Sequence, residues 1–470
     1  MDNAIIFISF GITTIFLLFC AWHSICRGKV YGVLFGGLAI YGFFAFEQIG
    51  TLSETFSTDV IGTAALVFAV GSVVLVLSIV AFEQTFPYRE AGSANLWVLR
   101  MWRSASDHTK WATIASCIAL VLLLHTRSNL GAAWNVARTT NGFETSVAAF
   151  FLLLGTPGIA SAVIRGKKFL ALSLFVINIV SFVLLGSRAA MLGALGFWVW
   201  IVFMRQRSRL KQLRILIIIV LLGFCAQVAL RFIRGFGLDE LLAALSNGDI
   251  FSLFISNPVV RHISGGEAAI VKYFMFSIEL APSDTFGFMT SIHRLALFFI
   301  PYSVHLLSKP MDVTYQLWAA AYSHGLFAHA AGADLLRKSY LSGDYGSIHP
   351  TLFGEMFVSG QWPSLIISVV IVGALCVFID RCLTHMSDTR ALLVLGPTIA
   401  GFLFVARGNS VIGFGYFIYL AVFVVIAGRI INVLRMRAHK SRVKLRGSSY
   451  ATQVANANAR STSGRIEASK

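Results

Sequence analysis

The chain has 470 residues, of which 57% are hydrophobic and only 13% are charged. Soluble globular domains carry about 25% charged residues, and the mean hydropathy of +0.77 also lies far on the apolar side. The composition therefore excludes a soluble globular domain and favours a membrane protein. The formal charge of +17 would suit a nucleic-acid partner only if the basic residues gathered on one surface.

Apolar runs of nearly membrane-spanning length follow one another along most of the chain. A transmembrane helix needs about 20 predominantly apolar residues, and we expect about eleven such helices here. The first run has almost no positive segment before it and no small-residue cleavage site, so we expect a retained helix. The expected spans are residues 5–26, 30–46, 59–82, 110–126, 143–164, 168–185, 189–204, 215–231, 363–379, 390–406 and 411–430.

The basic residues alternate from one connection to the next. With these spans, 26 of the 38 Lys and Arg fall in every second connection and in the C-terminal tail. The short connections on the other side hold only Arg127, Arg138, Arg188 and Arg407. The positive-inside rule then places the N-terminus outside and the C-terminus in the cytoplasm. The basic charge orients the chain, and we expect no nucleic-acid partner.

The chain divides into four parts on this interpretation. Residues 1–230 hold helices 1–8, residues 231–362 form an extracytoplasmic loop, residues 363–434 hold helices 9–11, and residues 435–470 form a disordered basic tail. The loop contains six of the eleven histidines, and a structureless loop of that length is rare. We expect a small helical subdomain or re-entrant segments. The apolar patch 286–307 is expected to lie in the interface, and the downstream topology is kept if both this patch and 314–333 cross the membrane or if neither does. The predicted fold is all-α and polytopic.

Cysteine usage and missing motifs limit the chemistry. All six cysteines lie in or beside apolar runs, which makes structural disulfides and a cysteine-based metal site improbable. The chain has no phosphate-binding glycine loop and no His-Glu-x-x-His zinc motif. A cytoplasmic nucleotide substrate or an ATP-driven cycle therefore lacks its usual anchors, and we place any chemistry on the outer side, on a substrate held in membrane lipid.

Four arginines are expected at the outer ends of helices. Arg188 follows Gly186 and Ser187 at the tip of a helix hairpin, Arg407 lies between the last two spans, and Arg231 and Arg234 leave the eighth span. A guanidinium stays charged and presents a planar fork that suits phosphate oxygens. The alternative is a charge that only sets topology or reaches toward the interface.

A second group of polar residues precedes the ninth span. Pro350 suits the first turn of a helix, and a helix that begins there places Thr351, Glu355 and Ser359 on one face. Glu355 could act as a general base with a raised pKa, or pair with an arginine to hold the loop. His349 could act with it, or serve as a helix cap or a packed side chain.

Two further basic residues of the loop are candidates for substrate contact. Lys309 precedes Pro310 and is held in a rigid turn, and Arg294 could meet a polyanion or a glycan. For Arg294 an ordinary surface role is the alternative.

The order of these elements resembles the oligosaccharide repeat-unit polymerases, the Wzy or O-antigen polymerase family of bacterial inner membranes. The resemblance rests on Gly186-Ser187-Arg188, on Phe299-Ile300-Pro301 followed by Lys309-Pro310, on His349-Pro350-Thr351 running into Gly354-Glu355, and on Arg407-Gly408. The resemblance covers the chain from about residue 110 to residue 430. One departure is Tyr302, which stands where the family pattern has an arginine.

The resemblance implies a membrane glycosyltransferase of the multi-helix, lipid-donor type, with no metal and no soluble cofactor. The growing glycan would leave its undecaprenyl diphosphate carrier and join a second carrier-linked repeat unit, building O-antigen or exopolysaccharide for lipopolysaccharide or related polymers. Arg188, Arg407, Arg231 and Arg234 would hold the diphosphates, and Glu355 or His349 would orient or deprotonate the acceptor. A chain-length regulator and a flippase are implied as partners. A glycan ligase and a lipid-linked oligosaccharide flippase, or another transporter, remain the alternatives.

Overall fold

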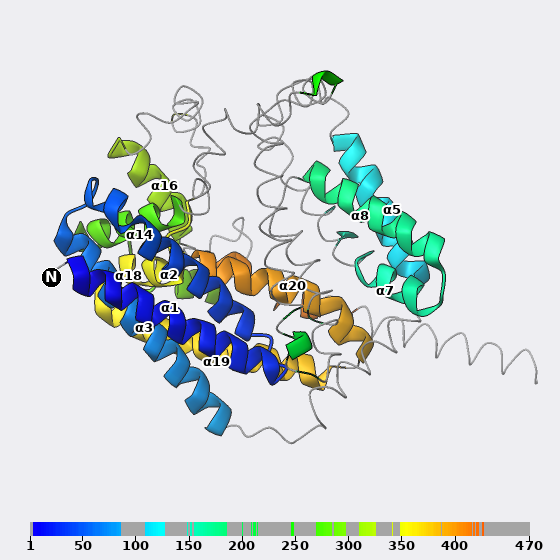
Figure 1. Ribbon diagram of the computed structural model, residues 1–470, viewed down its shortest axis with the longest axis horizontal. Helices are drawn as coiled ribbons and strands as arrows, with labels where there is room; N and C mark the ends of the chain where they lie inside the picture. Colours follow the sequence, from blue (N-terminus) through cyan, green and yellow to red (C-terminus); the bar gives the residue numbers. More distant parts are fainter. Residues whose placement is uncertain are drawn as a thin grey trace, which may run out of the picture. The chain divides into compact units, whose positions relative to one another are not determined.

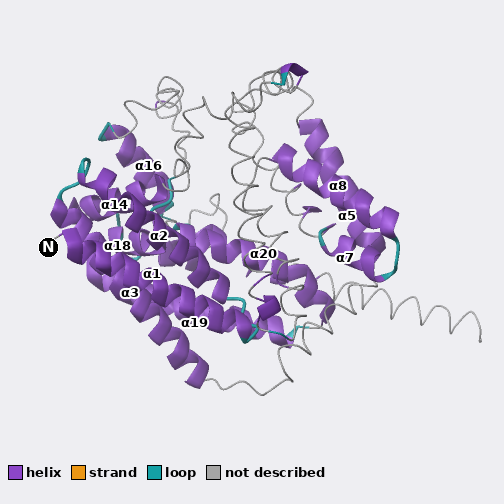
Figure 2. Cartoon of the chain, viewed as in Figure 1, coloured by secondary structure: helices purple, strands orange, loops and turns teal. Residues whose placement is uncertain are grey.

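The computed structural model describes residues 3–85, 109–126, 155–185, 269–283, 286–297, 310–325, 348–386 and 388–415, with a few isolated residues besides. Every regular element in these ranges is a helix (Figure 2). The helices are α1 (Asn3–Cys26), α2 (Gly32–Ser53), α3 (Thr58–Thr85), α5 (Thr109–Thr126), α7 (Pro157–Ile164), α8 (Lys168–Leu185), α14 (Ala269–Leu280), the 3-10 turn η3 (Ala281–Ser283), α15 (Thr290–Ala296), α16 (Val313–Ser323), α18 (Thr351–Val358), α19 (Gln361–His385) and α20 (Asp388–Arg407).

Four helices are long and apolar enough to cross a membrane, namely α1, α2, α3 and α19. Large apolar side chains stand exposed on them, as Ile15 and Phe19 do on α1, because lipid and not water is their solvent. The chain is therefore a multi-pass membrane protein. The predicted first, second, third and ninth spans match these helices, although α2 continues to Ser53 and so is longer than predicted. The predicted spans 189–204 and 215–231 lie wholly or largely outside the described residues.

The four spans pack closely through small residues, as is usual between helices in lipid. A methyl group at Gly42 of α2 would come within 2.5 Å of Thr14 Oγ1 on α1 and 2.9 Å of the Phe68 ring on α3. A methyl group at Gly373 of α19 would lie 2.7 Å from the Cβ atom of Ser78 on α3. Figure 1 shows α1, α2, α3 and α19 side by side.

One end of this bundle carries a network of buried and half-buried charges. Lys29 Nζ lies 3.0 Å from Glu83 Oε1 and 3.4 Å from Asp380 Oδ2. The Val30 N–H donates to Asp380 Oδ1 at 2.9 Å, and the Tyr31 hydroxyl donates to Glu83 Oε1 at 3.0 Å. The network joins the α1–α2 connection to the C-terminal ends of α3 and α19, which are the ends that the charge alternation assigns to the cytoplasm.

The helix α20 agrees in its bounds with the predicted run 390–406. It ends at Arg407, turns through Gly408 and Asn409, and a second helix begins at Ser410. The two arms touch, because a methyl group at Gly413 would come within 2.6 Å of the Gly401 carbonyl oxygen. These two helices form a hairpin, and we call Arg407–Ser410 the hairpin tip.

The hairpin tip packs on α18. Gly408 faces the backbone of Thr351, which begins α18. Two residues further on, the Phe353 ring packs on Gly71, near the midpoint of α3, and meets the Phe68 ring edge-on at 5.4 Å. Arg407 is the last residue of α20, and its location at the outer end of a spanning helix stays a prediction.

Helices of the predicted loop also enter the bundle. A methyl group at Gly354 of α18 would come within 2.6 Å of Ser277 Oγ and 2.8 Å of the Phe274 ring, both on α14. Phe274 in turn contacts Phe68 of α3, with ring centroids 6.2 Å apart. Polar residues of the predicted loop therefore lie in the interior of the bundle, where they can form a buried site.

The helices α5, α7 and α8 pack on one another. Their core contains Ala162, Ala171 and Leu174, and the Asn178 side-chain amide donates to Ser116 Oγ at 3.2 Å. Residues Tyr419–Lys470 form a second compact unit. The predicted tail 435–470 lies outside the described residues.

Candidate functional site

The site is built around α18, whose sequence fixes both of its ends. The prediction of a helix that begins at Thr351 is confirmed. Thr351 has φ +66°, a left-handed conformation that is costly for a β-branched residue. Its hydroxyl accepts a hydrogen bond from the Gly354 N–H at 3.4 Å, and the helix stops before Gly360, which has φ +129°. The side chains at positions 351, 355 and 359 share one face, and all are buried.

Glu355 is completely buried on this face, with 0% of its surface exposed. Its Oε1 atom accepts hydrogen bonds from Ser291 Oγ at 2.6 Å and from Ser410 Oγ at 2.7 Å. Its Oε2 atom accepts from the Ser410 N–H at 3.0 Å. A single carboxyl group thus joins α15, α18 and the hairpin tip.

The surroundings of Glu355 raise its pKa to about 7. Burial is the largest cause, because it penalises the charged form, and the Asp312 carboxylate adds repulsion. The hydrogen bonds from Ser291 and Ser410 act in the opposite direction by favouring the charged form. The carboxyl group can therefore exchange a proton near neutral pH.

The Arg294 guanidinium binds two other groups of the protein. Its Nη1 atom donates to the Pro310 carbonyl oxygen at 2.9 Å, and its Nε atom lies 3.4 Å from Asp312 Oδ2. Asp312 is 3% exposed, and it also caps α16 by accepting from the Thr314 N–H at 3.0 Å. The structure therefore gives Arg294 a role in holding the turn before α16, beside the Glu355 cluster.

His349 lies on the other side of the hairpin tip, next to Arg407 and Gly408. Only 9% of His349 is exposed, and burial, with the Arg407 guanidinium second, lowers its pKa to about 3. The imidazole is therefore neutral at physiological pH, although a backbone hydrogen bond with Gly408 opposes the shift. Its Nδ1 atom is buried and has no hydrogen-bond partner in the structure as described. A buried, unpartnered imidazole nitrogen is a binding point for a ligand that carries a hydroxyl group.

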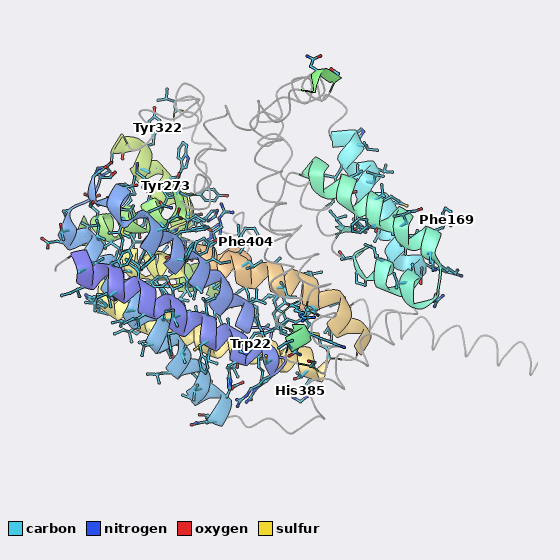
Figure 3. The ribbon with its side chains drawn as sticks, viewed as in Figure 1. Trp22, Phe169, Tyr273, Tyr322, His385 and Phe404 are labelled. Carbon is cyan, nitrogen blue, oxygen red and sulfur yellow. The ribbon has the colours of Figure 1, made fainter. Side chains whose placement is uncertain are left out.

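Tyr273 of α14 completes this side of the site. Burial raises the pKa of its phenol, and the positive charge of Arg407 opposes that shift, which shows that the two side chains interact. The phenol stays protonated and remains a hydrogen-bond donor. In Figure 3, Tyr273 and Phe404 lie in the part of the bundle that holds the site, away from Trp22 and His385 near the Lys29 network.

Of the predicted site residues, the structure brings His349, Glu355 and Arg407 together and places Arg294 beside them. Arg188, Arg231, Arg234 and Lys309 lie outside the described residues. The predictions missed Ser291, Asp312 and Tyr273. Each is a single polar residue in a mixed segment, and no spacing in the sequence marks it. Within the described ranges, no group of three His, Cys, Asp or Glu side chains could hold a metal ion.

The geometry defines a class of protein, a multi-pass membrane protein with a buried polar site between α14, α18 and the hairpin tip. Comparison of the chain with protein-family models, with curated proteins and with solved structures gives no match. The site offers a fixed cation, a protonated phenol and a neutral imidazole. Together these groups can hold an anion and orient a hydroxyl group beside it.

Proposed function

We propose that this protein polymerises oligosaccharide repeat units carried on undecaprenyl diphosphate, at the outer face of a bacterial inner membrane. One observation carries the proposal: two segments of the polymerase-like pattern, far apart in the sequence, meet in one buried site. Gly408 packs on Thr351, and Ser410 bonds to Glu355. Residues that resemble a family pattern and also converge in space are better evidence for a shared site than the pattern alone.

In the proposed reaction, a hydroxyl group of the acceptor repeat unit attacks the anomeric carbon of the donor glycan. A new glycosidic bond forms, the bond from the anomeric carbon to the diphosphate oxygen breaks, and undecaprenyl diphosphate leaves. The Nδ1 atom of His349 accepts a hydrogen bond from the acceptor hydroxyl group and orients it, and the hydroxyl proton passes to the departing diphosphate. Arg407 stabilises the negative charge that develops on the leaving diphosphate, and Tyr273 donates a hydrogen bond to the same group.

The proposed membrane arrangement keeps about eleven spans, an outer N-terminus and a cytoplasmic C-terminus. The Lys29 network supports it, because it collects helix ends that the charge rule assigns to one side. The catalytic site then opens toward the outer side, from which the loop helices α14 and α18 enter the bundle.

A second candidate function is transport of the lipid-linked oligosaccharide. Ionisable residues inside a membrane bundle often mark a substrate or proton pathway, and Glu355 and Asp312 are buried. The order of the polymerase-like segments favours the first proposal.

The glycan profile of a deletion strain separates the functions. Loss of a polymerase leaves one repeat unit on each acceptor, loss of a ligase leaves polymer on its carrier, and loss of a flippase leaves no surface glycan. We expect single repeats, restored to long chains by the wild-type gene and by Arg27→Ala, whose exposed side chain lies in the α1–α2 connection. Arg407→Ala and Arg188→Ala should keep the single-repeat profile. Long chains in the deletion strain would refute the proposal.

A further inference from the structure

Glu355 has the geometry of a structural clamp. All three of its hydrogen bonds come from Ser291 and Ser410, and none of its surface is exposed. A general base must reach the hydroxyl group of the substrate, either directly or through one water molecule. The carboxyl oxygens of Glu355 instead bond to the protein.

The hairpin tip is held at two points by one face of α18. Gly408, with φ +90°, presses so closely on Thr351 that a methyl group there would lie 2.5 Å from the Thr351 carbonyl oxygen. One helical turn further along α18, Glu355 binds the backbone and the side chain of Ser410. Residues four apart on a helix share a face, so Thr351 and Glu355 hold the tip from the same side.

The bond to the Ser410 N–H fits the needs of a helix start. The first N–H groups of a helix lack partners within it, and a carboxylate there is also favoured by the helix dipole. Asn409 Oδ1 accepts from the Ile412 N–H at 3.0 Å, and Glu355 takes the Ser410 N–H. Without Glu355, this donor would be buried without a partner, which costs about 1–3 kcal/mol.

The same carboxyl group also anchors α15 over the site. Ser291 lies in the first turn of α15, and the Met289 N–H just before that helix donates to the Ser359 carbonyl oxygen at 2.9 Å. Both ends of α18 are therefore fastened, one to the hairpin tip and the other to α15.

We infer that Glu355 is a positioning residue, which fixes the hairpin tip so that Arg407 stands where the diphosphate binds, and that it does not act as the base. Arg407 immediately precedes the held residues, so its guanidinium moves with them. This role rests on the proposed function, because the lipid diphosphate is the ligand that Arg407 is proposed to bind.

A glutamine at position 355 discriminates between a positioning residue and a general base. An amide oxygen in the place of Oε2 would still accept from the Ser410 N–H. The amide NH₂ in the place of Oε1 would donate to the two serine hydroxyls, which can accept as well as donate. Glu355→Gln therefore keeps the three contacts but cannot take a proton.

The experiment uses the full chain in lipid nanodiscs, with undecaprenyl diphosphate as the binding probe and polymer formation as the rate. The variants are Glu355→Gln, Glu355→Ala, Arg407→Ala and the double variant Glu355→Ala/Arg407→Ala. Glu279→Gln, on an exposed position of α14, is the matched control. Thermal unfolding shows that each variant is folded.

We expect Glu355→Gln to retain the rate and the affinity within about fivefold, whereas Glu355→Ala weakens binding at least about tenfold. In the Arg407→Ala background, Glu355→Ala should add nothing, because it acts through Arg407. If Glu355→Ala does not fold, the glutamine variant decides alone. A rate loss of about 10²-fold or more in Glu355→Gln with unchanged affinity indicates a base and overturns the inference. If the wild type binds no undecaprenyl diphosphate, the proposed function is refuted, and the positioning role of Glu355 is refuted with it.

Discussion

Replacing Gly408 by alanine tests the close contact between the hairpin tip and α18. Gly408 has φ +90°, where a side chain costs about 1–2 kcal/mol. The new methyl group would also lie 2.5 Å from the Thr351 carbonyl oxygen and 2.8 Å from the Thr351 nitrogen, and both are backbone atoms that cannot rotate away. Forced overlap of this kind costs about 1–3 kcal/mol. We expect a total loss of about 2–5 kcal/mol of unfolding free energy.

The matched control is Gly325→Ala, after α16. Gly325 has φ +71°, and a methyl group there would meet nothing within 4 Å, so only the backbone cost of about 1–2 kcal/mol applies. Thermal and denaturant unfolding of the purified protein, followed by tryptophan fluorescence, measures both variants. Gly408→Ala should also weaken the binding of undecaprenyl diphosphate, because the tip carries Arg407. Equal losses of stability for the two variants would refute the contact.

Three further predictions concern charged groups. Arg294→Ala leaves the buried Asp312 carboxylate without its guanidinium partner and should cost about 3–5 kcal/mol of unfolding free energy. The double variant Arg294→Leu/Asp312→Asn should show a smaller loss. Equal stability of the wild type and Arg294→Ala would argue against the Arg294–Asp312 ion pair. Lys29→Met should lower the unfolding temperature but leave the affinity for undecaprenyl diphosphate unchanged, because the Lys29 network lies at the C-terminal end of α3, away from Phe68 and Gly71, which contact α18. The pKa of Glu355 is raised from 4.5 to about 7, so the folded state holds the proton more tightly than the unfolded state does. The unfolding free energy of the wild type relative to Glu355→Gln should therefore fall by about 3 kcal/mol as pH rises from about 4.5 to about 7. A difference that stays constant or rises with pH would contradict this shift.

The sequence was sufficient to predict the four long apolar helices and the local helix around Glu355. Long apolar runs report directly on burial in lipid, and Pro350 followed by the Thr351, Glu355 and Ser359 spacing is a local signal. These features need no knowledge of tertiary contacts.

The contacts of the hairpin tip could not be predicted in the same way. Hydropathy indicates the apolar run 390–406, whereas the packing of the hairpin depends on the close approach of Gly401 to Gly413 and of Gly408 to Thr351. The partners of Glu355 were equally hidden, because Ser291 and Ser410 are far from it in the chain. Arg294 was predicted as a surface or substrate-contact residue, and the structure pairs it with Asp312, which is 18 positions away and within no motif.

The most direct test of the central claim is a reaction in liposomes that contain the purified protein and undecaprenyl diphosphate-linked repeat units. The wild type should convert these units into carrier-linked polymer and release one undecaprenyl diphosphate for each bond formed. Arg407→Ala should leave single units, while Arg27→Ala should behave as the wild type. If the wild type leaves every unit single and instead moves the units across the bilayer, the protein is a transporter and the polymerase proposal is wrong.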